Sequence, residues 1–197
     1  MPQIKQRENN IKQRENNRET DLLDAAARLF ADQGYHRTTI RDITSSVGMG
    51  PGSSYYHFAS KADMLRAVYE EGVRSVTESV RARLADESDP WERITLALEG
   101  HIEAVLTPTA HARVIVTVLP DDVPDVADDL RLLRDGYELL WKELIDDLDT
   151  PVDSQLLRLF LLGAANATQI WYREGDLAPS EIAASFVSFL RQPLERS

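Results

Sequence analysis

A group of short or aromatic polar side chains in the first third of the chain is the best candidate for chemistry. The group follows Gly50-Pro51 and consists of Ser53, Ser54, Tyr55, Tyr56 and His57. Hydroxyl and imidazole groups can hydrogen-bond to phosphates and to the edges of DNA bases. Proline at a first helical position loses no hydrogen bond, and the free N–H groups of a helix N-terminus favour an anion. The group therefore predicts a short helix that contacts DNA.

Caps and glycines mark the elements that would position this helix. A capping box from Thr39 to Asp42 predicts a preceding short helix that ends at Gly48. A second capping pair, Ser60 with Asp63, begins a longer third helix. Two short helices that are joined by a tight turn form a helix-turn-helix, in which the second helix enters the major groove.

The segment Gly34–Leu65 resembles the DNA-binding domain of the TetR family of bacterial repressors. The chain departs from the family pattern at Thr44 and Val47, which replace alanines, at Gly50, which replaces a serine, and at Ser54, which replaces a leucine. The change at Gly50 removes a hydroxyl cap, and the change at Ser54 removes apolar anchoring of the recognition helix. The matching positions are Gly34-Tyr35, Thr38-Thr39, Ile43, Gly48, Gly52, Tyr55, His57-Phe58, Ser60-Lys61 and Leu65.

The resemblance implies which residues contact DNA. Phosphate contacts are implied for Thr39, Tyr55, His57 and Lys61. Contacts near the bases or the groove edge are implied for Arg41, Pro51, Gly52, Ser53 and Tyr56. The alternatives are a packing role for His57 at a helix end and a merely solvated charge for Lys61 and for Arg41.

The N-terminal residues contain an exact duplication. Ile4–Asn10 reads IKQRENN, and Ile11–Asn17 repeats it letter for letter. Only one residue per unit is apolar, and two units are fewer than a coiled coil needs. Residues 1–17 are therefore expected to form a disordered polar arm. The alternative is a basic arm that touches DNA phosphates or the minor groove.

The remaining residues predict helices and no sheet. Start signals at Asp89-Pro90, Val123-Pro124 and Thr150-Pro151 each precede a long amphipathic run, and Pro179 begins the last helix. The β-branched run Arg113–Leu119 has no hairpin partner. The expected fold is all-α with about nine helices. Residues 18–66 would form a three-helix DNA-binding domain, and residues 67–197 a domain for ligand binding and dimerisation.

Polar and aromatic residues among the apolar stripes of residues 67–197 are candidates for a ligand site. The stretch Trp171–Asp176 resembles one in TetR-type regulators of lipid, steroid and acyl-CoA degradation, which implies an acyl-CoA or hydrophobic acid as effector. The alternatives are a core role for the aromatic candidates and a structural ion pair for Arg173. The candidates are His101, His111, Tyr137, Trp141, Asn166, Gln169 and Arg173.

Small residues near the C-terminal end predict a homodimer. The run Leu162–Ala167 allows close helix approach and, with the last helix, could pair with a second copy as a four-helix bundle. The resemblance implies the same mode of dimerisation. The expected interface residues are Leu161, Ala164, Ala165, Thr168, Phe186 and Leu190.

Composition argues against several other classes of protein. Cysteine is absent, no His or acidic spacing is typical of a metal or calcium site, and no nucleophile and base are paired, so neither an enzyme nor a metal or cofactor is expected. No stretch reaches the ~18 apolar residues of a membrane helix, which makes the cytoplasm the default compartment. Residues 1–66 carry 10 Lys/Arg against 8 Asp/Glu, and residues 67–197 carry 12 against 25. That asymmetry permits a DNA-reading head on an acidic body.

The resemblance implies a transcriptional regulator, most simply a repressor, that binds a palindromic operator as a homodimer and is released by a small molecule. Two alternatives belong to other classes. One is a small-molecule enzyme or carrier with a vestigial head. The other is a helical protein that binds DNA without sequence preference, which would show a steep salt dependence and little discrimination.

Overall fold

In the computed structural model the backbone is described for residues 2–50, 52–175 and 177–191, and the side chains are described from residue 17 onward within those ranges. These residues form eight α-helices and three short 3-10 turns, without a strand, which confirms the all-α prediction. The elements are α1 (Pro2–Gln33), α2 (Ile40–Ser46), η1 (Ser54–Tyr56), α3 (Lys61–Leu84), α4 (Pro90–Leu106), α5 (Ala110–Thr117), η2 (Pro120–Asp122), η3 (Pro124–Val126), α6 (Ala127–Asp146), α7 (Ser154–Trp171) and α8 (Pro179–Arg191).

The element expected as the second short helix of the helix-turn-helix is only the 3-10 turn η1. Ser53 precedes this turn without a side-chain cap, and the turn is closed by hydrogen bonds from the amides of His57 and Phe58 to the carbonyl of Ser54 (2.9 and 2.8 Å). Glycines at positions 50 and 52 oppose a longer helix, because glycine loses the most conformational freedom on folding. Pro51 lies outside the described residues.

The structure differs from the expected disordered arm at residues 1–17. The backbone of Pro2–Gln33 is one α-helix. No glycine or proline interrupts residues 3–33, and Lys, Arg, Gln and Glu are good helix formers. The helix ends at Gly34, whose φ of 86° is the left-handed conformation typical of a C-terminal glycine. The duplicated heptapeptide therefore extends α1 rather than forming a separate segment.

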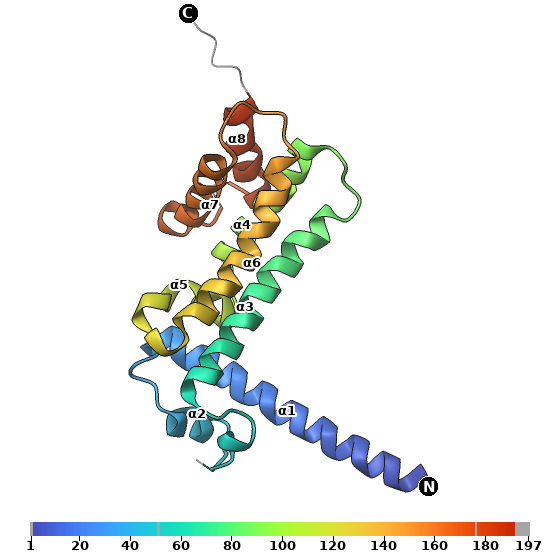
Figure 1. Cartoon of the computed structure of the whole chain (residues 1–197), viewed down its shortest axis with the longest axis vertical. Coiled ribbons are helices and arrows are strands. Elements are labelled where there is room, and N and C mark those ends of the chain that lie inside the picture. Colours follow the sequence, from blue (N-terminus) through green and yellow to red (C-terminus); the bar gives the residue numbers. More distant parts are fainter. Residues whose placement is uncertain (1, 51, 176, 192–197) are drawn as a thin grey trace, which may run out of the picture.

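The helices are arranged along one long axis (Figure 1). The C-terminal half of α1 lies with α2 and η1 at one end, which we call the head, and α7 and α8 lie at the other end. Helix α3 begins in the head at Ser60, whose hydroxyl accepts a hydrogen bond from the Asp63 amide, and it runs beside α6. A displacement of α3 would therefore alter the packing of both the head and the body.

Two hydrophobic cores divide the molecule, and the first is shared between the head and the body. The first core joins apolar residues of α1, α2 and the start of α3 to Val114 and Val118 of α5 and to Leu130 of α6. The second core is formed by α4, α6, α7 and α8. The expected functional boundary between residues 66 and 67 falls inside α3, so the first core crosses it.

Candidate functional site

The exposed surface of the head includes the turn η1 and the start of α2. Tyr55 and Tyr56 are 60% and 76% exposed although both are aromatic, and neither packs into a core. Gly52 and Ser53, which directly precede the turn, and Arg41 of α2 are also exposed. Large aromatic side chains that are held in water at the end of a helix-turn-helix suit contacts to DNA, because they can stack and donate a hydroxyl hydrogen bond.

Two residues of the same polar group are turned inward instead. Ser54, which was expected on the exposed face, is fully buried, because the 3-10 geometry of η1 directs it towards the head. The His57 side chain is only 8% exposed, with its Nδ1 3.9 Å from a Glu19 carboxylate oxygen and its ring edge-on to Tyr56. His57 therefore supports the position of Tyr56 from behind.

Thr39 begins α2 through the expected capping box. Its Oγ1 accepts from the Asp42 amide (3.1 Å), and its own amide and hydroxyl donate to the Asp42 carboxylate (2.9 and 2.7 Å). These hydrogen bonds lower the pKa of Asp42. The cap fixes the start of α2 and hence the position of Arg41 in its first turn.

Lys61 is partly buried, and its ammonium group is turned towards the loop between α1 and α2. Its Nζ donates to the backbone carbonyls of Tyr35 and Thr38 (3.0 Å each) and lies 4.1 Å from the centre of the Tyr35 ring. Burial lowers the pKa of Lys61. The ammonium group therefore fastens the first turn of α3 to the loop between α1 and α2.

The body contains a cleft of about 880 Å³ between α4, α5, α6 and α7, with part of α3 as its floor. Four of the residues expected at a ligand site line it, namely His101, Tyr137, Asn166 and Gln169. Three other candidates do not line it. Trp141 is buried behind His101 and Tyr137, while His111 and Arg173 lie elsewhere.

A neutral polar network forms one end of the cleft. The Tyr137 hydroxyl lies 2.7 Å from Nδ1 of His101, and Oδ1 of Asn166 lies 3.1 Å from Nε2. Because the amide oxygen accepts, Nε2 carries the hydrogen and Nδ1 accepts from the tyrosine. Burial lowers the pKa of His101, against a smaller opposite effect of Asn166, and burial raises the pKa of Tyr137 above its usual range. This end of the cleft is therefore uncharged and suits a neutral polar group of a ligand.

The charged residues of the cleft were missed by the sequence analysis. Arg113, Arg134 and Arg158 line it together with Glu138, which forms an ion pair with Arg158 between α6 and α7. Arg113 also forms an ion pair with Asp32 of α1 (2.9 Å). Three arginines against one glutamate make the cleft positive in a chain of net charge −11. No spacing in the sequence marks these arginines, because they come from three different helices.

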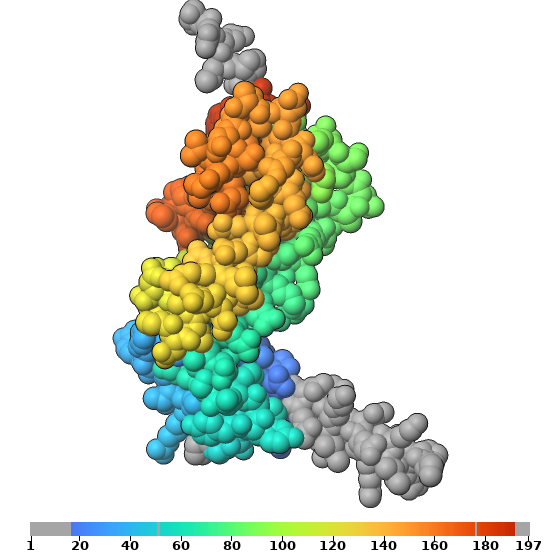
Figure 2. Space-filling view, in the orientation of Figure 1, coloured from blue at the N-terminus to red at the C-terminus, as the bar shows by residue number. Residues whose placement is uncertain are grey.

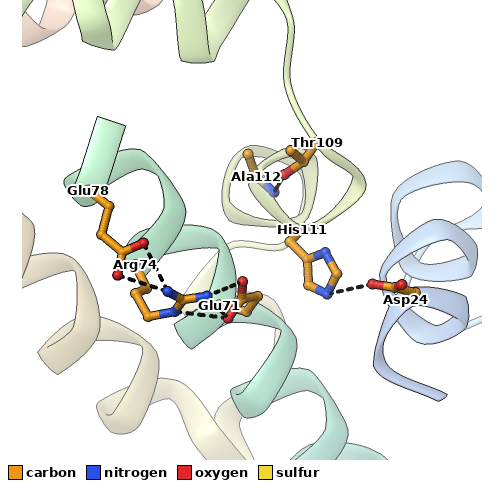
Figure 3. Close-up of polar contacts among 7 residues, drawn as sticks. All are labelled: Asp24, Glu71, Arg74, Glu78, Thr109, His111 and Ala112. Atoms are coloured by element: carbon orange, nitrogen blue, oxygen red, sulfur yellow. Dashed lines mark hydrogen bonds and ion pairs between the residues drawn. The ribbon is translucent and has the colours of Figure 1, made fainter. Parts of the chain in front are cut away.

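His111 lies between the body and the head instead of in the cleft (Figure 3). Its Nε2 is 3.7 Å from Oδ1 of Asp24 on α1. Burial lowers the pKa of His111, while Asp24 and Glu71 act in the opposite direction. Figure 3 also shows Arg74 of α3, which binds the carboxylates of Glu71 and Glu78 on its own helix. His111 is thus a contact between α5 and α1.

Half of the residues expected at a dimer interface are buried inside the chain's own second core. Leu161, Ala165 and Thr168 have no exposed surface, because that side of α7 packs on α4. Ala164, Phe186 and Leu190 are partly buried. The exposed apolar residues of α7 and α8 lie on the opposite sides of these helices and include Leu156 (64%), Phe160 (53%), Ile170 (82%) and Phe189 (69%).

Two other kinds of site have no counterpart among residues 2–50, 52–175 and 177–191. No group of three or more His, Asp or Glu side chains is placed to hold a metal ion among these residues. None of the helices described is long and apolar enough to cross a membrane.

Comparison with known proteins identifies the family. The profile of bacterial regulatory proteins of the tetR family matches residues 22–68, and that of the tetracyclin repressor-like C-terminal domain matches residues 87–194. The transcriptional repressor KstR2 of Mycobacterium tuberculosis is 29% identical over 187 residues, which cover 89% of this chain and 92% of the relative.

Solved structures agree on the fold over nearly the whole chain. Superantigen PfiT is 31% identical with a TM-score of 0.79, covering 87% of this chain and 95% of its own. AibR in complex with isovaleryl coenzyme A and operator DNA is 23% identical with a TM-score of 0.74, covering 88% and 97%. The profile match to more than half of the chain, and the helix-turn-helix that the structure places in the head, lead to one conclusion: this protein belongs to the TetR family of bacterial transcriptional regulators.

Proposed function

We propose that the protein is a repressor that binds a palindromic operator as a homodimer and is released by a small-molecule effector. The observation that carries the proposal is that α5 both packs on α1 of the head, which exposes two tyrosines, and lines a positively charged cleft. Such an arrangement allows occupation of the cleft to alter the head. A regulator of this kind acts on the chromosome in the cytoplasm and needs no catalytic group.

The proposed DNA contacts divide the head into two kinds of residue. Arg41, Gly52, Ser53, Tyr55 and Tyr56 are proposed to touch the duplex directly, with the hydroxyl of Thr39 at the border of this surface. His57 and Lys61 are proposed to position it, which their burial and hydrogen bonds support. Residues 18–66 would thus act as the DNA-binding part, and residues 67–197 as the part that binds effector and partner.

The effector is proposed to be an acyl-CoA or another hydrophobic acid. Apolar walls, a neutral polar end and three arginines in one cleft suit an elongated molecule with an anionic group. The solved complex of AibR holds isovaleryl coenzyme A, and that protein shares this fold. His101, Tyr137, Asn166 and Gln169 would contact this molecule, together with the cleft arginines.

Dimerisation is proposed to bury the exposed apolar sides of α7 and α8. Large apolar side chains that are more than half exposed cost free energy in water, and a second copy of the same surface could cover them by a two-fold axis. Two heads on one dimer would then reach successive major grooves ~34–36 Å apart.

The proposal is tested by binding of the protein to labelled DNA from around its own gene. Fluorescence anisotropy at near-physiological salt, with scrambled DNA as competitor, should show binding that survives the competitor with two protomers per site. Tyr56→Ala should weaken this binding about tenfold, because the side chain is 76% exposed and its proposed contact with a base or phosphate would be lost. Leu132→Ala, an equally exposed change on α6, is the matched control and should have no effect. Equal competition by scrambled DNA at every site offered would contradict sequence-specific repression.

A further inference from the structure

Arg113 belongs to two sites at once. Its side chain lines the cleft, and its Nη1 lies 2.9 Å from Oδ1 of Asp32 near the C-terminal end of α1. None of the other cleft residues for which the structure describes an ion pair reaches the head in this way, since Arg158 pairs within the body with Glu138. Any anion that enters the cleft therefore meets a guanidinium group that is already engaged with the head.

Helix α5, which carries Arg113, is the common wall of the cleft and of the head. Its Ala112 and Ile115 line the cleft. Its Val114 is buried in the first core, which also contains residues of α1 and α3. Figure 2 shows the yellow surface, which belongs to the part of the chain that includes α5 and the turns after it, lying directly on the blue surface of the head. A shift of α5 that is caused by contacts on its cleft side would therefore displace α1 directly, because the two helices pack against each other.

The ion pair is suited to exchange rather than to permanent support. Arg113 and Asp32 have side chains that are 44% and 61% exposed, and ion pairs of this exposure contribute little to stability. Asp32 also lies in the last turn of α1, where the helix dipole is negative and disfavours a carboxylate without a cation. Removal of Arg113 from Asp32 therefore leaves an unfavourable charge at the junction of α1 with α5.

We infer that the anionic group of the effector takes Arg113 from Asp32, and that this exchange of partners couples the cleft to the head. The inference rests on the proposed effector-released repressor and specifies how release occurs. The pair between Arg113 and Asp32 belongs to the operator-binding state, and the pair between Arg113 and the effector belongs to the released state. By linkage, operator DNA must weaken effector binding by the same factor that effector weakens operator binding.

Single substitutions at the two partners change effector affinity in opposite directions. The probe is isovaleryl coenzyme A, with isothermal titration calorimetry as the measurement on the dimer without DNA. Asp32→Asn frees Arg113 from its competitor, so affinity should rise about two- to fivefold. Arg113→Gln removes the cation, so affinity should fall about tenfold. Asp147→Asn is the matched control, because it breaks the Arg93–Asp147 pair (3.2 Å) away from the cleft and the head, and it should change nothing.

An uncharged probe shows whether the charge is what matters. S-isovaleryl-N-acetylcysteamine carries the same acyl thioester as isovaleryl coenzyme A but lacks the phosphates. Its affinity should respond to neither Asp32→Asn nor Arg113→Gln, and saturating amounts of it should leave operator binding within about twofold of the ligand-free value.

The effect of Asp32→Asn on operator affinity is a second test of the inference, because two explanations predict opposite directions. Removal of a negative charge from the head should by Coulomb attraction strengthen DNA binding, whereas loss of the operator-state ion pair should weaken it. We expect Asp32→Asn to weaken operator binding about two- to fivefold. The charge-swapped variant Asp32→Arg/Arg113→Asp re-forms the pair, so it should bind the operator while losing the response to isovaleryl coenzyme A.

The outcomes separate this inference from the proposed function. Equal affinity of isovaleryl coenzyme A for the unchanged protein, Asp32→Asn and Arg113→Gln, with release of the operator intact, would overturn the partner exchange and leave the repressor standing. Failure of both isovaleryl coenzyme A and decanoate to bind the unchanged protein would overturn the anionic effector class and the exchange together.

Discussion

At the scale of single residues, the head depends on polar groups that work from the inside. Lys61 joins the start of α3 to two backbone carbonyls of the loop before α2, and Ser60 and Thr39 cap the helices on either side. Because a recognition surface must be held rigidly to read bases, these contacts contribute to DNA binding without touching DNA. The two roles can be told apart by measurement. Loss of a phosphate contact changes the salt dependence of DNA binding, whereas loss of a structural contact lowers the free energy of unfolding.

Substitution of Lys61→Met should reduce stability and leave the salt dependence of operator binding unchanged. It removes the donors to the carbonyls of Tyr35 and Thr38, which should cost roughly 1–3 kcal/mol in the free energy of unfolding by urea. Lys142→Met, which breaks an exposed pair with Asp146, should stay within about 0.5 kcal/mol. A slope of log affinity against log salt that became shallower by about one unit would instead identify Lys61 as a phosphate contact.

The neutral state of His101 predicts a dependence of stability on pH. Its pKa is lower in the folded chain than the ~6.5 of an unfolded one, so the unfolded state takes up a proton first as the pH falls. The contribution of His101 is therefore present above about pH 6.5 and is lost towards the lower folded pKa, with a slope of up to ~1.4 kcal/mol per pH unit. His101→Gln should flatten the curve of unfolding free energy between pH 5 and 7, leaving a smaller slope from His111. Identical slopes in both proteins would show that folding does not lower the pKa of His101.

The sequence indicated which residues belong to the site better than it indicated which of their side chains are exposed and which are buried. The exposure of Tyr55 and Tyr56 followed from large polar side chains in a segment too short to bury them. The burial of Ser54 and the inward course of Lys61 did not, because a 3-10 turn and an α-helix place the same residue on different sides. The cleft arginines are brought together only by the packing of α5, α6 and α7, which no local pattern records.

At the scale of elements, the packing of α3 on α5 depends on a glycine. A Cβ added to Gly72 would lie 2.7 Å from the backbone carbonyl oxygen of His111, so the two helices are closer there than any side chain permits. Helix ends were predicted well where a cap and a break coincide, as at Thr39 and Gly48. They were predicted less well where several polar residues compete, since Asp153 rather than Thr150 caps α7.

Substitution of Gly72→Ala should force α5 away from α3 and lower stability by roughly 1–3 kcal/mol. Thermal denaturation followed by circular dichroism is the measurement. Gly136→Ala is the matched control, because a Cβ there meets nothing within 4 Å, and it should stabilise α6 by about 0.5–1 kcal/mol. Two variants of equal stability would mean that α3 and α5 separate without cost.

At the scale of the whole molecule, the end that is formed by α7 and α8 exposes several large apolar side chains. Phe160, Ile170 and Phe189 are each more than half exposed on α7 and α8. The sequence placed the expected interface on residues of α7 and α8 that the structure buries wholly or in part within the chain, because a run of small residues fits a close contact within one chain as well as one between two chains. The exposed side of α7 and α8 can be identified only from the structure, because it depends on which side of these helices packs on α4.

Substitution of Phe160→Glu should convert the protein to monomers, as measured by sedimentation velocity at micromolar concentration. A carboxylate buried against its own copy is repelled as well as desolvated. Operator affinity should fall by at least tenfold, since one head would then bind half of the site. Leu132→Glu on α6, which is 71% exposed, should leave the dimer intact. A dimeric Phe160→Glu protein would place the interface elsewhere.

The shared first core limits how this regulator could exchange parts with its relatives. A graft of the head onto another body at residue 66 would separate α1 and the start of α3 from Val114, Val118 and Leu130, which complete their packing. A transplantable reading unit would have to carry α5 and the beginning of α6 with it, although these lie more than forty positions further along the chain. New combinations of operator and effector should therefore arise more readily by substitution within one chain than by recombination between two.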